Sequence, residues 1–270
     1  MVSNDQRRRQ LAREKFLRQQ QRRESARRKA RTRNTVIASA LAVVVVAGAG
    51  AFAAGAFDGK DTKDSVASKP SASPSKAADP CAKPAAGKVK SLSWKKEPAL
   101  TIDKSAGYTM NLATTCGDIG IDLKTKEAPH TVNSFDFLAG KGFFDHTKCH
   151  RLTTNGIYVL QCGDPKGTGA GGPGYTIPDE NLKDKSLKAN VYPAGTIAMA
   201  NTGQKHTGGS QFFLVYQDSQ LPPSYTPFGT ISDSGMKVLK KIAAAGESTG
   251  QGDGAPNATV VIDKATVKKS

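Results

Sequence analysis

Short runs in which apolar and polar residues alternate fill the C-terminal two thirds of the chain. Segments 108–114 (YTMNLAT) and 117–123 (GDIGIDL) alternate with a period of two and lie on either side of a tight turn. Period-two alternation interrupted by tight turns is typical of antiparallel strands. Further strands are expected at 99–102, 195–201, 211–216, 228–231 and 258–267.

Two other segments have the period of an α-helix. Segment 128–145 carries Pro129 near its first turn, and either Gly140 or Gly142 can end it. Segment 235–246 is the second. Their apolar faces consist of Val132, Phe135, Leu138 and Ala139 in the first helix and Met236, Leu239, Ile242 and Ala243 in the second. Many short strands and two helices predict a mainly-β barrel or sandwich capped by the helices.

The first 57 residues follow a different pattern. Residues 1–34 hold 13 Lys or Arg against three acidic residues, whereas residues 35–57 hold no charged residue. This run is long enough to cross a bilayer, which takes about 20 residues in a helix. Because basic residues stay on the cytoplasmic side, we expect 1–34 to be a basic cytoplasmic tail and 35–57 a transmembrane signal anchor.

A cleaved signal peptide and a nucleic-acid-binding tail are the alternatives for this region. The charged stretch is too long for a signal peptide, and the apolar run exceeds the usual length of about 7–15 residues. Clustered arginines suit phosphates, but next to an apolar run they are explained by topology and anionic lipid head groups. We therefore expect the cell membrane as a partner through 35–57, no nucleic acid, and a single-pass protein whose remaining chain is extracytoplasmic.

Composition changes again after the apolar run. Residues 58–90 are rich in Ser, Pro, Ala and Lys, which is typical of a flexible linker, and residues 91–270 are expected to form one domain. All four cysteines follow the apolar run, on the side where disulfides persist, and they allow three pairings. Zinc is the alternative, but the chain has no C-x-x-C ligand pair, so no metal is expected.

Common catalytic motifs do not fit this sequence. The stretch GTGAGG at 167–172 matches the glycine spacing of dinucleotide sites, yet it runs into Pro173 and opens no helix, which indicates a loop. No G-x-S-x-G motif is present, and Asp164, Asp179 and Glu180 lie in turn-rich sequence. Hydrolysis is disfavoured, and no cofactor is expected.

A different set of side chains suits a peptide backbone and an apolar ring. Arg151 stands near the head of segment 149–164, in which residues 157–160 are almost wholly apolar. A surface ion pair is the alternative reading of this arginine. Because successive strand residues face opposite ways, one of Phe212 and Phe213 should point into the core. The whole set consists of Arg151, Gln161, Asn201, Gln211, Phe212 and Phe213.

The order of the motifs resembles the cyclophilins, the peptidyl-prolyl cis-trans isomerases, over residues 98 to 268. The matching motifs are HRL (150–152), LQCGDPKGTGAGGPGY (160–175), GTIAMANTG (195–203), GSQFF (209–213) and the stretch from Leu221 to FGTI (228–231). The resemblance implies an eight-stranded antiparallel barrel capped by two α-helices. Within the family, this sequence is most similar to the membrane-tethered bacterial type, whose CHRLTT and LQCGDP segments carry the same two cysteines.

The resemblance also implies roles for individual residues. Arg151 falls at the position of the family's catalytic arginine. Gln220 stands where the family often has a tryptophan that helps to hold cyclosporin. The glutamine at this position puts cyclosporin binding in doubt more than it does isomerase activity. Substrate binding is implied for Tyr158, Val159, Gln161, Ala200, Asn201, Gln211, Phe213, Leu221 and Tyr225.

The expected function is therefore isomerisation of X-Pro bonds during folding of extracytoplasmic proteins. A non-catalytic proline-peptide-binding or chaperone module at the membrane surface is the alternative. Cys149 and Cys162 fall on consecutive strands of an expected hairpin, so we hypothesise that they form a disulfide. Cys81 and Cys116 would then form the second one.

Overall fold

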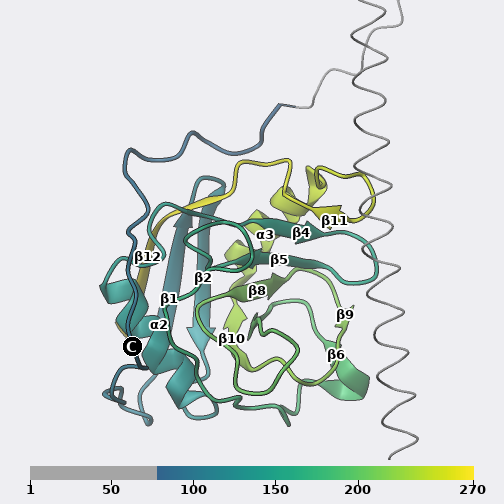
Figure 1. Cartoon of the computed structure of the whole chain (residues 1–270). Helices are drawn as coiled ribbons and strands as arrows, with labels where there is room; N and C mark the ends of the chain where they lie inside the picture. Colours follow the sequence, from purple (N-terminus) through teal and green to yellow (C-terminus); the bar gives the residue numbers. More distant parts are fainter. Residues whose placement is uncertain (1–77) are drawn as a thin grey trace, which may run out of the picture. The chain divides into compact units, whose positions relative to one another are not determined.

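The computed structural model describes residues 78–270, which belong to one compact unit (Figure 1). The basic tail 1–34, the apolar run 35–57 and the first part of the expected linker lie outside the described residues. Across 78–270, no helix combines the length and the hydropathy that a bilayer crossing would need.

A curled antiparallel sheet forms most of this unit. Its strands run in the order β11-β4-β5-β8-β7-β10-β2-β1-β12-β3, and a separate two-stranded sheet pairs β6 with β9. The large sheet comprises β1 (Tyr108–Thr114), β2 (Gly117–Leu123), β3 (Thr147–Lys148), β4 (Arg151–Thr153), β5 (Val159–Cys162), β7 (Thr196–Met199), β8 (Phe212–Val215), β10 (Pro227–Ile231), β11 (Asp253–Gly254) and β12 (Val261–Lys269). The small sheet comprises β6 (Val191–Tyr192), which follows the short 3₁₀ helix η1 (Lys188–Asn190), and β9 (Ser219–Gln220).

Segment 147–153 runs from one end of the large sheet to the strand next to the other end. Its first part, β3, pairs with β12, and its last part, β4, pairs with β5. Between them the Cys149 N–H donates to the Val260 carbonyl at 3.0 Å, whereas the His150 N–H donates to the Gln161 carbonyl at 3.1 Å. The segment thus changes its hydrogen-bond partner between Cys149 and His150, which curls the sheet toward a barrel.

The number of strands differs from the eight that were expected. Ten strands form the large sheet of the described chain. Segment 147–153 counts as two short strands because of its change of partner, and the two-residue strand β11 adds to the edge beside β4. The mainly-β architecture with two helices is confirmed.

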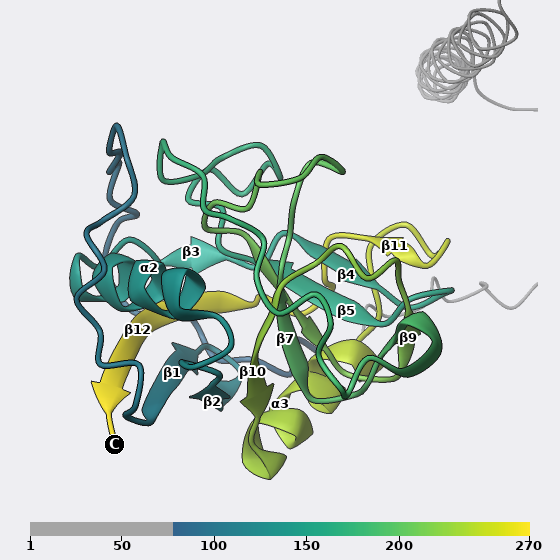
Figure 2. The same cartoon turned by 90° about the horizontal axis from the view of Figure 1, so that it is seen from below.

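Both expected helices are present. Helix α2 (Pro129–Gly140) begins at Pro129 and ends at Gly140, and it packs against β12. Helix α3 (Asp233–Ala244) packs against β2 and is capped at its start by Ser232, whose Oγ accepts the Gly235 N–H at 3.1 Å. A serine in this position satisfies a free N–H of the first turn. Figure 2 shows the two helices against different parts of the curled sheet.

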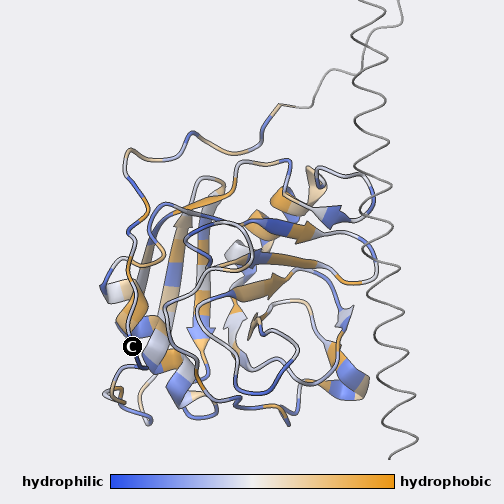
Figure 3. Cartoon of the chain, in the orientation of Figure 1, coloured by the Kyte–Doolittle hydropathy of each residue, from blue (hydrophilic) through white to orange (hydrophobic). Residues whose placement is uncertain are grey.

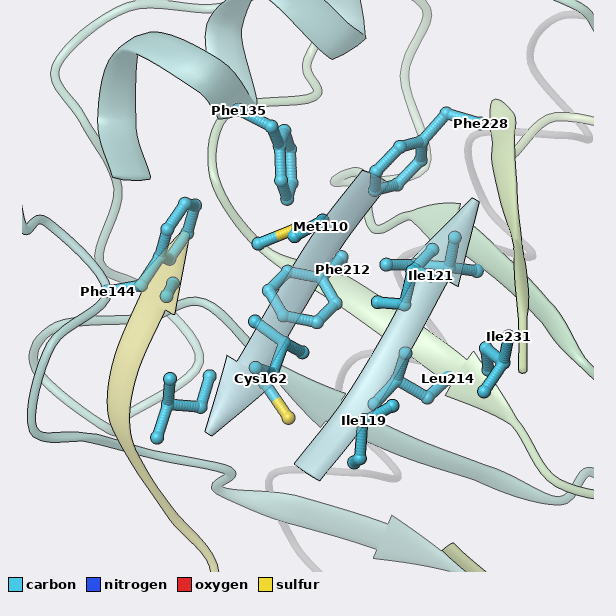
Figure 4. Packing of buried hydrophobic residues seen from close by; sticks show 14 of the residues in the cluster. Met110, Ile119, Ile121, Phe135, Phe144, Cys162, Phe212, Leu214, Phe228 and Ile231 are labelled. Atoms are coloured by element: carbon cyan, nitrogen blue, oxygen red, sulfur yellow. The ribbon is translucent and has the colours of Figure 1, made fainter. Parts of the chain in front are cut away.

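Aromatic and branched side chains from the sheet and α2 fill the interior (Figure 4). The Phe135 ring of α2 lies 4.6 Å from the Phe228 ring and 5.2 Å from the Phe144 ring, centroid to centroid. Burial of each such side chain stabilises the fold by about 1.5–3 kcal/mol. In Figure 3 the hydrophobic colours gather on the strands and helices while the connecting loops are mostly hydrophilic, in keeping with the alternation in the sequence.

The strand expected at 99–102 is wrong. This segment has no ladder partner, because the Asn133 side chain of α2 satisfies its backbone groups instead. The Oδ1 atom of Asn133 accepts the Thr101 N–H at 2.9 Å, and its Nδ2 donates to the Ala99 carbonyl at 3.0 Å. The apolar pattern of ALTI could not reveal a side-chain partner 32 residues away.

Residues 78–97, which we call the strap, lie bound to the surface of the domain. The strap is tied by the Cys81–Cys116 disulfide, by the Ala82 N–H donating to the Thr115 carbonyl, and by the Trp94 N–H donating to the Pro173 carbonyl, both at 2.8 Å. The Trp94 ring packs edge-on against Phe137 at 5.0 Å. The structure therefore differs from the flexible linker expected over 58–90 from residue 78 onward.

Removing the Cys81–Cys116 disulfide should destabilise the domain. In the double variant Cys81→Ser/Cys116→Ser we expect the free energy of unfolding to fall by about 2–4 kcal/mol, because the disulfide closes a long loop in the unfolded chain. Urea unfolding without reductant measures this change, and limited proteolysis between residues 82 and 97 reports release of the strap. Unchanged unfolding and cleavage would mean that the strap's hydrogen bonds and Trp94 hold it without the disulfide.

Candidate functional site

A row of residues in register crosses four neighbouring strands on one face of the sheet. Arg151 of β4 pairs with Gln161 of β5, Gln161 pairs with Phe213 of β8, and Phe213 pairs with Ala198 of β7. Strands β4, β5 and β8 lie side by side in Figure 1, with β11 next to β4 at the edge, and β7 is the next strand after β8 in the sheet. Because cross-strand partners point to the same face, the sheet register alone sets a cation, an amide and an aromatic ring in line.

A small pocket of about 120 Å³ opens beside this row. It is lined by Arg151, Ile157, Val159, Gln161, Ala200, Asn201, Phe213, Leu221 and Tyr225. The structure thus brings together eight of the ten side chains that the sequence placed at the site. The other two are Gln211, which lies just outside the pocket, and Tyr158.

Tyr158 does not line the pocket, which corrects the sequence-based assignment. Successive strand residues alternate between faces, so Ile157, Val159 and Gln161 point to the pocket while Tyr158 points the other way. The Tyr158 ring packs against the main core and lies 6.0 Å from the Tyr216 ring. Ile157 takes the place expected for Tyr158, and extending the alternation backward from Gln161 would have identified it.

Aromatic rings form the apolar wall of the pocket. The Phe213 and Tyr225 rings meet edge to face at 5.4 Å, while Phe212 points into the core on the other side of β8, as expected for one of the pair. Behind them, the hydroxyl of the fully buried Tyr192 donates to the Tyr225 carbonyl at 2.7 Å. Burial raises the pKa of Tyr192 to about 12, so this hydroxyl keeps its proton and its hydrogen bond at neutral pH.

The Arg151 guanidinium is fixed by two side chains. Its Nε and Nη2 atoms donate to the two carboxylate oxygens of Asp253 at 2.7 and 2.8 Å, and its Nη1 donates to Gln161 Oε1 at 3.2 Å. This fork-to-fork contact holds the planar guanidinium in one orientation. It leaves one N–H on each of Nη1 and Nη2 for another acceptor. The side chain keeps 37% of its area exposed, so that acceptor can reach it.

Asp253 is the polar neighbour that sequence reasoning missed. It lies on β11 in a glycine-rich stretch, 102 residues after Arg151, and nothing in its local pattern connects the two. Hydrogen bonding to Arg151 lowers the pKa of the Asp253 carboxyl, and the same contact raises the pKa of Arg151. The pair is therefore fully ionised at neutral pH. The ion pair considered as the alternative for Arg151 is present, and it orients the guanidinium at the pocket.

Hydrogen bonds between amides extend the row away from Arg151. Gln161 Nε2 donates to Gln211 Oε1 at 2.9 Å, and Gln211 Nε2 donates to the Gly171 carbonyl at 2.9 Å. Asn201 Nδ2 donates to the Ser224 carbonyl at 2.8 Å. Arg151, Gln161, Gln211 and the glycine-rich loop are thus one connected network whose side chains are oriented before any ligand arrives.

Beside the pocket lies a larger open groove of about 1020 Å³, which shares Gln161, Ala200 and Asn201 with it. The glycine-rich stretch 167–172 forms a loop as expected, and its residues 169–172 are part of the groove wall. Asp164 holds this loop. Burial alone would raise the pKa of its carboxyl, but backbone N–H groups of the loop that donate to it bring the pKa below its usual value. A Cβ on Gly171 would overlap the Asp164 carboxylate, so the loop requires glycine there.

Both hypothesised disulfides are present. Cys149–Cys162 ties the junction between β3 and β4 to the end of β5, and Cys81–Cys116 ties the strap to the turn after β1. All four cysteines are thus paired and offer no thiolate to a metal. No group of three metal-ligating side chains occurs among residues 78–270.

Fold and site together define a mainly-β protein with a small apolar pocket edged by donors and acceptors for a peptide backbone. Residues 109–267 match the sequence profile of the family described as "Cyclophilin type peptidyl-prolyl cis-trans isomerase/CLD". The chain belongs to this family.

Named relatives agree with this assignment. The chain is 51% identical over 196 residues to the "Probable peptidyl-prolyl cis-trans isomerase B" of Mycobacterium leprae, a match that covers 70% of this chain and 62% of that protein. It is 40% identical over 126 residues to the "Peptidyl-prolyl cis-trans isomerase B" of Bacillus subtilis, covering 46% of this chain and 82% of that protein. The chain thus spans about three fifths of the length of the mycobacterial relative.

Among solved structures, a Cryptosporidium parvum cyclophilin-type isomerase "in the presence of dipeptide ala-pro" has a TM-score of 0.50 and 27% sequence identity. The similarity covers 60% of this chain and 99% of that chain. Cyclophilin membership and the curled-sheet fold are thus supported by sequence and by structure.

The contact between Arg151 and Asp253 should survive mild acidification. Because Asp253 has a lowered pKa, it stays ionised as the pH falls from 7 to about 4, near the ordinary pKa of an aspartate, and the contact is lost only below that range. The Nε–H resonance of Arg151 in ¹H–¹⁵N spectra should therefore keep its position down to about pH 4.

Asp253→Asn is the matched variant for this measurement. It should move the resonance at every pH and abolish the acid transition, because the amide cannot titrate. If the Arg151 Nε–H proton of the wild-type protein exchanges so fast at neutral pH that its resonance is averaged with that of the solvent, the contact between Arg151 and Asp253 does not hold in solution.

Proposed function

We propose that the domain is a peptidyl-prolyl cis-trans isomerase that accelerates the folding of extracytoplasmic proteins. The observation that carries this proposal is the Arg151 guanidinium, which is held by Asp253 and Gln161 at the edge of an apolar pocket. Family membership and the names of the relatives point to the same activity.

The reaction needs no covalent chemistry. Rotation about the bond before proline is slowed by amide resonance, which sets a barrier of about 18–20 kcal/mol. Uncatalysed rotation takes tens to hundreds of seconds and can limit folding. When the amide twists, the proline nitrogen gains a lone pair that can accept a hydrogen bond. A donor fixed next to this nitrogen therefore stabilises the twisted state more than the planar one, which is the condition for catalysis.

Arg151 has the properties that such a donor needs. Its remaining N–H groups are oriented in advance, because the Asp253 and Gln161 contacts fix the plane of the guanidinium. The raised pKa of Arg151 keeps the group protonated at every physiological pH. Gln161, Gln211 and Asn201 lie where they can bind the substrate backbone, so that the proline side is held while the preceding carbonyl swings.

The size of the pocket agrees with a proline ring as the occupant. A pocket of about 120 Å³ is smaller than pockets for drug-sized ligands and cofactors, which run from about 300 to 1,000 Å³. Phe213, Leu221, Ile157 and Val159 give it apolar walls. We further propose weak binding of cyclosporin, because residue 220, next to Leu221, is an exposed glutamine that offers no indole ring.

Loss of the guanidinium should abolish most of the rate enhancement. For Arg151→Ala we expect kcat/KM with a proline peptide to fall by about 10²–10³-fold, the usual effect of removing one donor to a transition state. Arg151→Lys should also lose activity, because an ammonium group cannot make the two-pronged contact with Asp253. A protease-coupled or NMR exchange assay measures the rates.

Tyr158→Phe is the control for this test, since Tyr158 faces away from the pocket. It should keep wild-type turnover. Near-normal turnover of folded Arg151→Ala would reject the assignment. Wild-type protein that competes for proline peptides without raising the isomerisation rate would favour the binding module instead, and suppression of aggregation that survives Arg151→Ala would favour the chaperone.

The place of action is a second part of the proposal. We propose that residues 35–57 anchor the chain in the cell membrane and that the domain lies outside the cytoplasm. The uncharged run behind a basic tail supports the anchor and its orientation, and the two disulfides of the domain fit an oxidising compartment. The clients would then be exported polypeptides that contain proline.

Charges placed inside the apolar run should release the full-length chain from membranes. Each aspartate at the centre of a membrane helix costs about 2.5–3.5 kcal/mol of insertion free energy. We therefore expect Val44→Asp/Val46→Asp to move the chain to the soluble fraction, whereas Ser71→Asp/Ser73→Asp, with the same added charge in the linker, should leave it with the membrane. Membrane fractionation after a carbonate wash tests both, and a wild-type chain found in the soluble fraction would refute the anchor.

A further inference from the structure

The strap forms part of the wall of the groove beside the proline pocket. Its residues 93 and 95–97 line this groove, as do residues 200–202. The strap is held there because the Trp94 side chain is anchored on Phe137 and Phe143 and because its backbone N–H donates to the Pro173 carbonyl. The anchored tryptophan leaves the side chains on either side of it facing the groove.

Positive charge dominates the lining of this groove. Lys95 and Lys96 of the strap and Lys166 of the glycine-rich loop all line it and are all exposed. Across residues 78–270 these three lysines form no ion pair. The one acidic residue in the lining, Glu97, contacts His130 Nδ1 at 3.2 Å. The groove thus presents three lysines whose charge no protein carboxylate neutralises directly.

The groove is continuous with the proline pocket, since the two share Gln161, Ala200 and Asn201. An extended chain advances by about 3.3 Å per residue. A substrate whose proline occupies the pocket therefore places side chains a few residues away, on one side of the proline, in the groove. The lysine ammonium groups there attract a carboxylate, whereas an apolar side chain could pack only against the methylene groups of the lysines.

We propose that this groove selects proline-containing chains that carry Asp or Glu two or three residues to one side of the proline, and that Lys95 and Lys96 of the strap recognise that carboxylate. The proposal rests on the proposed isomerase function and adds the class of substrate to it. It makes the strap a specificity-determining part of the site.

Peptides that differ only in charge test this proposal. In one series Glu stands two or three residues before proline, in a second it stands two or three residues after, and each peptide has a partner with Gln in the same place. Exposed ion pairs contribute about 0.2–1 kcal/mol each, so two lysines should lower KM for the Glu peptides of one series by roughly two- to thirtyfold against their Gln partners. The value of kcat should change little, because the contact is equal in the ground and transition states.

The variant Lys95→Gln/Lys96→Gln should remove most of this preference while keeping turnover of the Gln peptides. Lys83→Gln/Lys88→Gln is the matched control, because both lysines are exposed on the same strap and lie outside the groove lining. The two substitutions remove the same amount of charge as Lys95→Gln/Lys96→Gln. The control should retain the preference. Raising the salt to about 0.5 M should reduce the preference, since screening shortens the reach of exposed charges.

Two outcomes would overturn the inference while leaving the isomerase intact. One is equal KM for Glu and Gln peptides in both series, and the other is a preference that persists in Lys95→Gln/Lys96→Gln. If no peptide is isomerised, the isomerase proposal fails instead. Calorimetric Kd values for the same Glu and Gln peptides then decide whether the groove selects carboxylates, with equal Kd values counting against it.

Discussion

The change of hydrogen-bond partner between Cys149 and His150 is the constraint on which the rest of the molecule depends. One continuous segment serves as the last strand at one end of the sheet and as a strand near the other end. The Cys149–Cys162 disulfide fixes this junction covalently to the neighbouring strand. Because Arg151 comes directly after His150 at this junction, the interaction that curls the sheet also sets where the guanidinium stands.

The curled sheet produces two separate apolar clusters, because successive residues of its strands face opposite sides. On β5 and β8 one set of residues, with Leu160, Cys162, Phe212 and Leu214, packs into the main core. The other set, with Val159, Phe213 and Val215, forms a smaller cluster that opens to the surface as the pocket. One face of these strands thus stabilises the fold through the main core, and the other face forms a rigid recognition surface. The pocket is therefore present without any conformational change.

Two parts of the site are ordered by partners that lie far away in the chain. Asp253 orients Arg151, and the strap completes the groove. Both partners come from other segments, and neither lies in the small pocket itself. The glycine-rich loop is instead shaped locally by Asp164, which accepts the Gly169 N–H five residues further on. The electrostatic character of the surface is therefore a property of the whole domain: one oriented cation at the pocket and several unpaired lysines along the groove.

The sequence by itself determined the local features. Period-two alternation located β1 and β2 at their observed ends, helical periodicity and the positions of Pro129 and Gly140 located α2, and the order of motifs identified the family and most pocket residues. These features depend on neighbours along the chain, which a pattern can report.

Only the tertiary structure decided the rest, because the deciding contacts join residues far apart in sequence. It bound residues 99–102 to Asn133, laid the strap against the domain, and brought Asp253 to Arg151. Side-chain caps and ion pairs of this kind follow from how the sheet curls, and no local pattern of apolar and polar residues encodes that curl.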